Sequence, residues 1–169
     1  MKLRLSEAYI WFPVRVENPN KLVTLFSGEN PEEKWREFQI PWPEPGQEPD
    51  FWTAIPTAPY TGKEAVLCGD FPEERLRSVR LEKERPLPDV NRPFWHLSPE
   101  RGWMNDPNGL VLNEGIYHCY YQYHPFGLQW GPMYWNHAES RDLLHWETKG
   151  VALFPDETGT MYSGCCFPD

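Results

Sequence analysis

The chain of 169 residues has no long apolar run. No stretch approaches the roughly 20 consecutive apolar residues that a membrane-spanning helix requires. Its first residues, Met1 to Ala8, lack the apolar core and the small-residue cleavage site of a secretory leader. We therefore expect a cytoplasmic location by default and no membrane partner. Secretion stays open if the start codon has been misassigned.

Basic residues, cysteines and histidines are also sparse. The chain has 16 basic and 25 acidic residues, and its formal net charge of −9 disfavours nucleic acid as a partner. The four cysteines lack the C-x-x-C spacing of a zinc site, so we interpret them as buried free thiols. The five histidines are scattered and lack a His-Glu-x-x-His pattern. We therefore expect no metal and no cofactor, and the sequence leaves the oligomeric state open.

No helical periodicity persists, and short β-like runs are separated by Pro and Gly. In the first half these runs predict strands at 8–16, 21–26, 35–40, 51–55 and 65–68. The charged segment 73–84 is either a short helix or a strand, and Pro86 and Pro88 follow it in a linker. We place a domain boundary near residue 89. Residues 1–88 are then expected to form a small, β-sandwich-like domain.

The second half, residues 89–169, alternates strands and turns. Residues 109–123 predict a hairpin whose turn lies at 113–115. Further strands are predicted at 134–140 and 146–153. Four short antiparallel strands of this kind fit one blade of a β-propeller.

The most informative segment is Trp-Met-Asn-Asp-Pro-Asn-Gly, residues 103–109. Pro107 fixes its own φ angle and favours an extended conformation for Asp106. Asn108 and Gly109 both tolerate positive φ, so they predict a tight turn. The pattern predicts a carboxylate held where a strand meets a turn, beside an aromatic ring that suits the apolar face of a sugar. The same string is also compatible with an ordinary structural loop.

Further aromatic and polar motifs follow this segment in order. They read Tyr-His-Cys-Tyr-Tyr-Gln-Tyr-His-Pro-Phe (117–126), Trp-Gly-Pro-Met-Tyr-Trp-Asn-His-Ala (130–138), Ser-Arg-Asp-Leu-Leu-His-Trp (140–146) and Gly-Thr-Met-Tyr-Ser-Gly-Cys (159–165). In this order and spacing they closely resemble the opening of the glycoside hydrolase family 32 catalytic domain, which contains invertases, levanases and inulinases. The resemblance covers roughly residues 91–169.

The resemblance implies an all-β fold in which a five-bladed propeller carries the active site. Residues 89–169 would then correspond to the first blade and the start of the second, so that the propeller is incomplete. Residues 1–88 look like the accessory β-domain found in front of some levanase-like members of the family. An unrelated β-sandwich stays open for this part of the chain.

The resemblance also assigns roles to individual residues. Asp106 matches the nucleophile of a retaining β-fructofuranosidase. Positions that match substrate contacts or pocket walls are Asn105, Gln122, Trp130, Ser163, Trp103 and Tyr162. A carboxamide such as that of Gln122 suits sugar hydroxyls because it both donates and accepts hydrogen bonds. Gln122 could instead be a strand residue whose side chain is satisfied by the backbone.

A retaining mechanism needs a second carboxylate. In the family this is a Glu in a Glu-Cys segment, and a separate Arg-Asp-Pro segment binds fructose. Neither segment occurs here. The sequence has no Glu-Cys pair, and Arg141 and Asp142 are followed by Leu143 and not by proline. We therefore expect the chain to be the N-terminal piece of a longer enzyme that hydrolyses fructosyl linkages of levan, inulin or sucrose, and to be inactive alone.

Two other functions remain open. A non-catalytic fructan-binding or sensing protein would keep the aromatic pocket and lack the acid. An inverting propeller glycosidase fits residues 103–109 less well than a retaining one does. The sequence does not choose among sucrose, inulin and levan.

Overall fold

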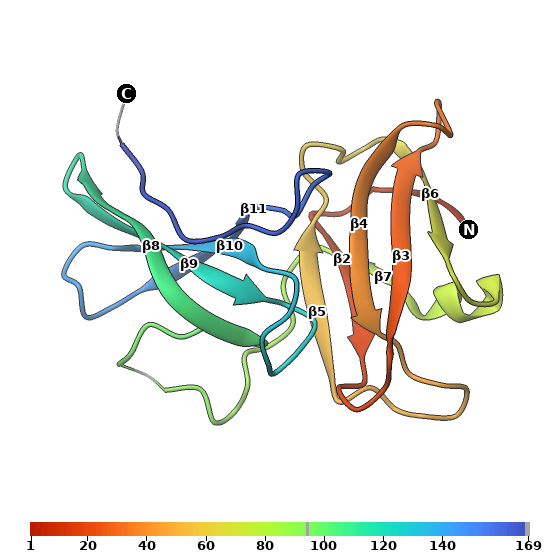
Figure 1. Cartoon of the computed structure of the whole chain (residues 1–169), viewed down its shortest axis with the longest axis horizontal. Coiled ribbons are helices and arrows are strands. Elements are labelled where there is room, and N and C mark those ends of the chain that lie inside the picture. Colours follow the sequence, from red (N-terminus) through yellow and green to blue (C-terminus); the bar gives the residue numbers. More distant parts are fainter. Residues whose placement is uncertain (94, 168–169) are drawn as a thin grey trace. The chain divides into compact units, whose positions relative to one another are not determined.

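The computed structural model describes residues 1–93 and 95–167, whose regular secondary structure is almost entirely antiparallel β-sheet (Figure 1). The chain divides into two compact units, Met1–Pro86 and Leu87–Asp169. Within the described residues, no helix is long and apolar enough to cross a membrane. The expected all-β class is confirmed.

The first unit contains two sheets and one short 3₁₀ helix, η1 (Glu73–Ser78). The four-stranded sheet has the order β1 (Lys2–Arg4), β6 (Glu64–Gly69), β3 (Asn20–Ser27) and β4 (Lys34–Pro41), and the three-stranded sheet has the order β5 (Phe51–Pro56), β2 (Tyr9–Val14) and β7 (Arg80–Glu82). All five strands expected in this unit are present. The sequence analysis missed β1, and segment 73–84 holds both a helix and a strand.

Alternating apolar side chains close the core of the first unit. Ile10, Phe12 and Val14 on β2 are buried, as the period of two in a half-buried strand requires. The Phe12 ring lies 5.2 Å from the ring of Phe38 on β4, so the two sheets meet through aromatic contacts. Trp42 completes this core with an exposed fraction of 2%.

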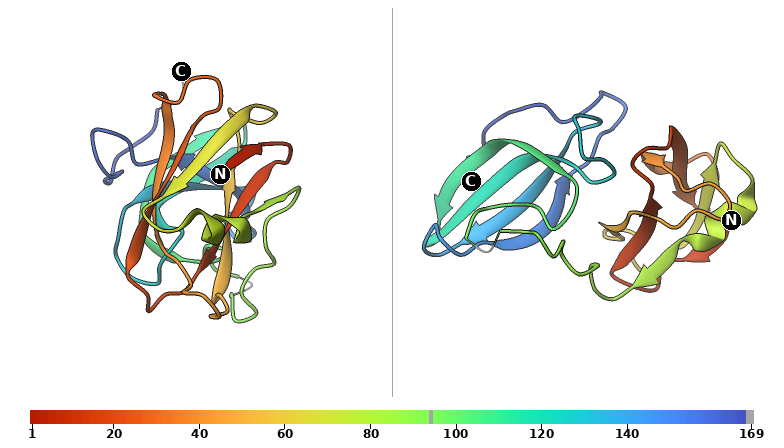
Figure 2. Two further views of the ribbon diagram at one scale, coloured as in Figure 1. Left: turned by 90° about the vertical axis from the view of Figure 1, so that its right-hand side faces the viewer. Right: turned by 90° about the horizontal axis from the view of Figure 1, so that it is seen from below.

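The second unit is built around one sheet in which β8 (Trp103–Asn113), β9 (Ile116–His124), β10 (Tyr134–Ser140) and β11 (Glu147–Leu153) pair in chain order. All three pairings are antiparallel. The right-hand view of Figure 2 shows these strands, coloured green to blue, side by side in a twisted sheet. This four-stranded meander has the architecture of a single propeller blade.

The prediction of a turn at Asn108 and Gly109 is wrong. Both residues lie inside β8, where the pairing with β9 shifts register twice, between Met104 and Pro107 and between Asn108 and Val111. Gly109 has a φ of 51°, so the residue types that predicted a turn serve a β-bulge instead. Positive φ values also occur in the hairpin turn itself, which was placed correctly at 113–115.

The interpretation of the cysteines is partly wrong. All four are free, but only Cys119 is buried, whereas Cys68 and Cys165 are exposed and Cys166 is half-buried. Burial raises the pKa of the Cys119 thiol to about 11. This thiol is therefore a packing group of β9.

Candidate active site at the bulged strand

Three residues that the sequence analysis singled out form one hydrogen-bonded chain. Ser163 donates from its hydroxyl to Oδ2 of Asp106 over 2.8 Å. Gln122 donates from Nε2 to the same hydroxyl oxygen over 3.2 Å. Since the Ser163 oxygen accepts from Gln122, its proton is free to point at the carboxylate. The chain runs from a buried amide on β9 to an exposed carboxylate on β8.

The segment that carries Ser163 is attached to the sheet by hydrogen bonds on either side of this residue. The amide of Met161 donates to the carbonyl of Met133 over 2.9 Å, and the Thr160 hydroxyl donates to the same carbonyl over 3.0 Å. On the other side, the Gly109 amide donates to the Gly164 carbonyl over 3.3 Å. Ser163 is thus held against β8 although it lies 57 residues from Asp106 in the chain.

Trp135 is a supporting residue that the sequence analysis missed. It pairs directly with Gln122 across β9 and β10, so both side chains lie on one face of the sheet. Its indole N–H donates to the carbonyl of Tyr162 over 3.0 Å. A Cβ placed on Gly164 would lie 3.2 Å from the Trp135 ring, so the backbone there packs on the indole.

The bulge of β8 shapes the other side of the site. Asn108 is buried, and its Oδ1 accepts a hydrogen bond from the Gly164 amide over 3.4 Å. A Cβ on Gly109 would lie 2.5 Å from Sγ of Cys166, so only glycine allows this close approach. The bulge therefore does two things at once: it re-aims Asp106, and it makes room for the segment that carries Ser163.

The other residues predicted to contact substrate make fewer contacts with the hydrogen-bonded residues described above. Asn105 is exposed beside Asp106 in the bulged segment, and Trp103 is half-buried where β8 pairs with His124 of β9. Tyr162 is 68% exposed, and its backbone, not its ring, is anchored.

Trp130 lies in the connection between β9 and β10 and is 66% exposed. No hydrogen bond or ring contact joins it to Asp106 within residues 1–93 and 95–167. His124 fixes this connection, because one ring nitrogen, Nδ1, lies 3.0 Å from the carbonyl oxygen of Gln129. A Cβ on Gly127 or Gly131 would meet the same ring at about 2.5 Å. Burial lowers the pKa of His124, so its ring is neutral near pH 7.

The geometry fits a carboxylate that is oriented for reaction. Oδ2 of Asp106 is tied to Ser163, whereas Oδ1 makes no hydrogen bond with any residue that the structure describes. A carboxylate fixed through one oxygen and open at the other can attack an electrophilic carbon. No second acidic side chain takes part in the hydrogen-bonded chain among the described residues.

The histidines are scattered in the sequence, but two of them meet across β9 and β10. Nδ1 of His118 and Nε2 of His137 lie 3.0 Å apart, and Glu139 is beside both. The three side chains are close enough to share a metal ion. Because this contact depends on the register of β9 with β10, no sequence spacing revealed it.

Comparison with known proteins matches the part of the chain that carries this site. Residues 96–169 match the profile of the glycosyl hydrolases family 32 N-terminal domain. The levanase of Bacillus subtilis is 60% identical over 78 residues, which are 46% of this chain and 12% of that protein. The sucrose-6-phosphate hydrolase of Zymomonas mobilis is 55% identical over 76 residues, which are 43% of this chain and 15% of that protein.

Among solved structures, the exo-inulinase of Aspergillus awamori is similar at 49% identity and a TM-score of 0.37. The similarity covers 39% of this chain and 13% of that one. The matched stretch is thus a small part of each relative, at 12–15% of the length of the two enzymes compared by sequence.

Proposed function

We propose that the full-length protein is a retaining β-fructosidase in which Asp106 is the nucleophile, because residues 96–169 match the profile of the glycosyl hydrolases family 32 N-terminal domain. The observation that carries the proposal is the hydrogen-bonded chain from Gln122 through Ser163 to Asp106. It holds one oxygen of the carboxylate and leaves the other available.

The proposed reaction has two steps. In the first, Oδ1 of Asp106 attacks the anomeric carbon of a fructosyl unit while a general acid protonates the leaving oxygen. The bond to the leaving group breaks and a fructosyl ester of Asp106 forms. In the second, the same acid, now a base, takes a proton from water, which displaces the carboxylate and releases fructose. The two carboxyl groups of a retaining pair lie about 5–5.5 Å apart.

Ser163 and Gln122 act on this reaction through the position of Asp106. Ser163 keeps Oδ2 pointed away from the substrate, and Gln122 fixes the direction of the Ser163 hydroxyl. Near the carboxylate, Asn105 supplies an exposed amide for sugar hydroxyls, and Trp103 and Tyr162 supply aromatic surface. Sugar rings stack well on such surfaces because one of their faces is apolar.

Levan, inulin and sucrose are the proposed substrate class. The sequence similarity to an enzyme named levanase and to one named extracellular exo-inulinase supports polymeric fructans. The similarity to a sucrose-6-phosphate hydrolase supports a fructosyl disaccharide. The substrates in all these names contain a fructosyl group, and this is the part of the substrate that Asp106 would attack.

The test is fructose release by the full-length protein carrying Asp106→Asn. Loss of the covalent step should lower the rate by several orders of magnitude while circular dichroism shows an unchanged fold. Asp142→Asn is the matched control. Asp142 is also an exposed acid, and it follows the end of β10 that is far from Trp135. A folded Asp106→Asn protein with more than a tenth of normal activity contradicts the proposal. Tight fructan binding without turnover by the unmutated protein would favour the binding or sensing alternative.

The 169-residue chain alone is proposed to release no fructose. Asp106 can attack, but no acid in the hydrogen-bonded chain protonates the leaving oxygen, and such assistance is worth about 10²–10⁴-fold. Turnover that disappears with Asp106→Asn would show that an acid within these residues completes the mechanism.

A further inference from the structure

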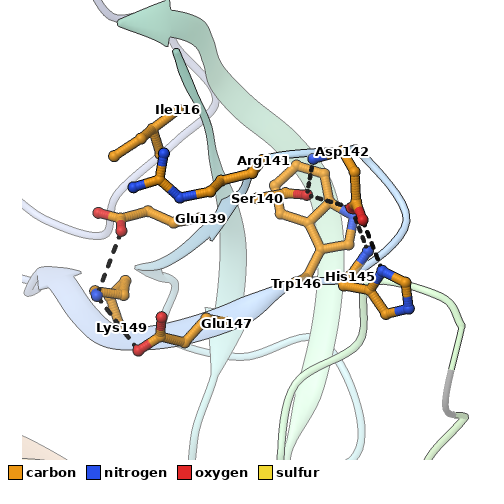
Figure 3. A pocket seen from close by; sticks show the side chains of 9 residues that line it. All are labelled: Ile116, Glu139, Ser140, Arg141, Asp142, His145, Trp146, Glu147 and Lys149. Carbon is orange, nitrogen blue, oxygen red and sulfur yellow. Dashed lines mark hydrogen bonds and ion pairs between the residues drawn. The ribbon is translucent and has the colours of Figure 1, made fainter. Parts of the chain in front are cut away.

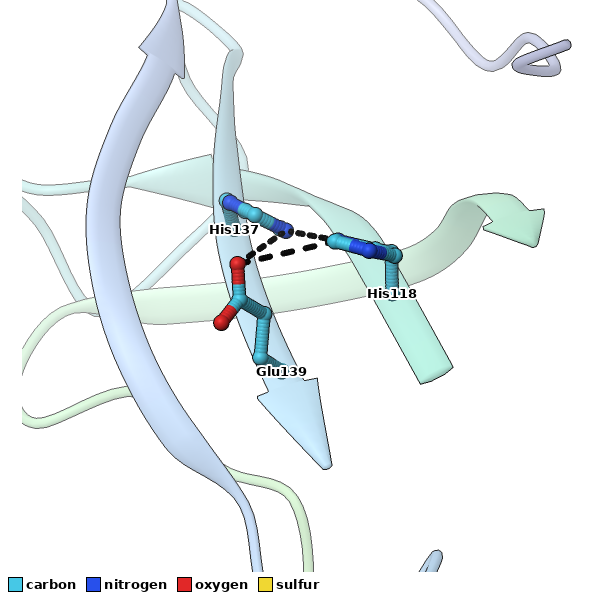
Figure 4. A group of neighbouring side chains, drawn as sticks. All are labelled: His118, His137 and Glu139. Atoms are coloured by element: carbon cyan, nitrogen blue, oxygen red, sulfur yellow. Dashed lines mark hydrogen bonds and ion pairs between the residues drawn. The ribbon is translucent and has the colours of Figure 1, made fainter. Parts of the chain in front are cut away.

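A second group of side chains lies on the same sheet, farther along β9 and β10. His118 and Glu139 are direct cross-strand partners, and His137 precedes Glu139 by two residues, so all three share one face. Figure 4 shows the two rings and the carboxylate turned toward one another. His118 is four residues from Gln122, or about 13 Å along β9, so the group is separate from Asp106 and its partners.

The spacing of the three nearest atoms fits a bound metal ion. His118 Nδ1 and His137 Nε2 are 3.0 Å apart, and Glu139 Oε1 is 3.7 Å from the first and 3.9 Å from the second. A point equidistant from all three atoms lies about 2.1 Å from each, which matches zinc–nitrogen and zinc–oxygen bond lengths. An ion at this point would lie in the plane of the three atoms, so a tetrahedral site would require the Glu139 carboxylate to move closer to the two rings.

The surroundings fix the orientation of one ring and of the carboxylate. The ring of His137 stacks on Tyr120 at a centroid distance of 4.3 Å, which holds its orientation. Lys149 binds the other carboxylate oxygen, Oε2 of Glu139, over 3.3 Å, so Oε1 remains directed at the two rings. Outer contacts of this kind orient ligands in metal sites.

The group is shielded but can be reached from solvent. The exposed fractions of its side chains are 18% for His118, 15% for His137 and 24% for Glu139. Glu139 and Lys149 also line a cavity of about 610 Å³ (Figure 3). Water or a small ligand in this cavity could complete a four-coordinate site, because three protein ligands leave one position open.

We propose that His118, His137 and Glu139 bind one divalent transition-metal ion of the zinc class, which ties β9 to β10. Two imidazoles and one carboxylate are a ligand set that zinc accepts. The proposal is independent of the fructosidase proposal, because it uses none of the residues around Asp106. A hydrogen bond between two neutral histidines is the competing account of the same geometry.

The test uses the full chain with Zn²⁺ in calorimetric titration and Co²⁺ as a visible probe. We expect one Zn²⁺ per chain and a Co²⁺ spectrum without thiolate charge-transfer bands, since no cysteine is a ligand. Glu139→Gln and His137→Gln should each weaken Zn²⁺ binding by more than about 100-fold, because outer-shell changes alone cost 10–100-fold. His145→Gln is the control and should bind as the unmutated chain does, since His145 is 85% exposed and pairs with Asp142.

The outcomes separate the two accounts. Failure of the unmutated chain to bind Zn²⁺, which needs no variant and no assumption about folding, overturns the proposal and leaves the hydrogen-bonded histidine pair. Affinity retained by either ligand variant, or thiolate bands in the Co²⁺ spectrum, overturns the assigned ligand set. Saturable binding that is lost in both ligand variants and kept in His145→Gln supports the site.

Discussion

The two units of the chain use antiparallel strands in opposite ways. In the first, two sheets enclose Phe12, Phe38 and Trp42, and Leu22 is the one large apolar side chain reported as exposed among its described residues. In the second, a single sheet buries Tyr121 and Tyr134 on one face and carries Asp106 and Gln122 on the other. Among the described residues of the second unit, the exposed large apolar side chains include Leu110, Leu112, Leu128, Trp130, Leu143, Leu144 and Tyr162.

This difference shows where each unit places its chemical variety. In a closed sandwich, the apolar residues at alternate positions of each strand form the core between the two sheets, so these side chains are mainly structural. A single sheet with one open face can instead present carboxylate, amide, imidazole and indole groups from neighbouring strands. The predictions below test this division, from the largest effect to the smallest.

The first prediction concerns the core of the first unit. Phe12→Ala should lower the free energy of unfolding of this unit by about 3–5 kcal/mol, because the side chain is fully buried against Phe38. Leu110→Ala is the counterpart in the second unit. It should change the free energy of unfolding of that unit by less than about 0.5 kcal/mol, since Leu110 is 65% exposed. Urea denaturation measures both. Equal losses would show that the Leu110 side chain is packed after all.

The second prediction concerns the bulge. Gly109→Ala should cost about 1–3 kcal/mol locally, because φ is 51° and the new Cβ would meet Cys166. It should also release the segment around Gly164, seen as faster hydrogen exchange of the amide at position 109 than in the unmutated protein. Gly115→Ala is the control: its φ is 77°, but nothing lies within 4 Å of the added atom. If both variants behave alike, strain alone and not the close approach explains the glycine.

The third prediction concerns the residue that orients the carboxylate. Ser163→Ala in the full-length protein should lower kcat by about tenfold, because the carboxylate loses the hydrogen bond that fixes Oδ2 and Gln122 loses its acceptor. KM should change less, since the fold of the site is retained. Ser163→Thr, which keeps the hydroxyl, should recover most of the rate. An unchanged kcat in Ser163→Ala would remove Ser163 from the mechanism.

The fourth prediction compares one cysteine from each unit. A pKa of about 11 in place of 9.0 lowers the thiolate fraction of Cys119 near pH 8 by about 100-fold, so Cys119 should resist a thiol reagent that modifies the exposed Cys68. Because the folded pKa is the higher one, the contribution of Cys119 to stability is complete below pH 9 and is lost as the pH rises toward 11. Peptide mapping after labelling measures the difference. Equal labelling would show that β9 opens readily.

Much of the fold could be predicted because it depends on local patterns. The alternating burial of β2 and β5 follows their residue types, and the hairpin turn was placed from its own residues. The strand β1 was missed because three residues are too few to show a period, and its place comes from pairing with β6. The bulge at Asn108 and Gly109 was taken for a turn because both structures use the same positive φ.

The site divides in the same way. Asp106, Gln122 and Ser163 were identified through the resemblance of their motifs, and the structure joins them by two hydrogen bonds. The contact of Trp135 with Tyr162 was missed because it depends on how a distant segment crosses the sheet. His118 and Glu139 were missed because strand register, which the sequence does not state, makes them neighbours.

The central claim is that Asp106 attacks the fructosyl carbon and forms a covalent intermediate. The most direct test is NMR observation of the first fructose anomer that the full-length protein releases. Two successive displacements at the same carbon restore its configuration, so the proposed mechanism predicts a product with the anomeric configuration of the substrate. A first-formed product of inverted configuration would mean a single displacement by water and would contradict the role of Asp106 as nucleophile.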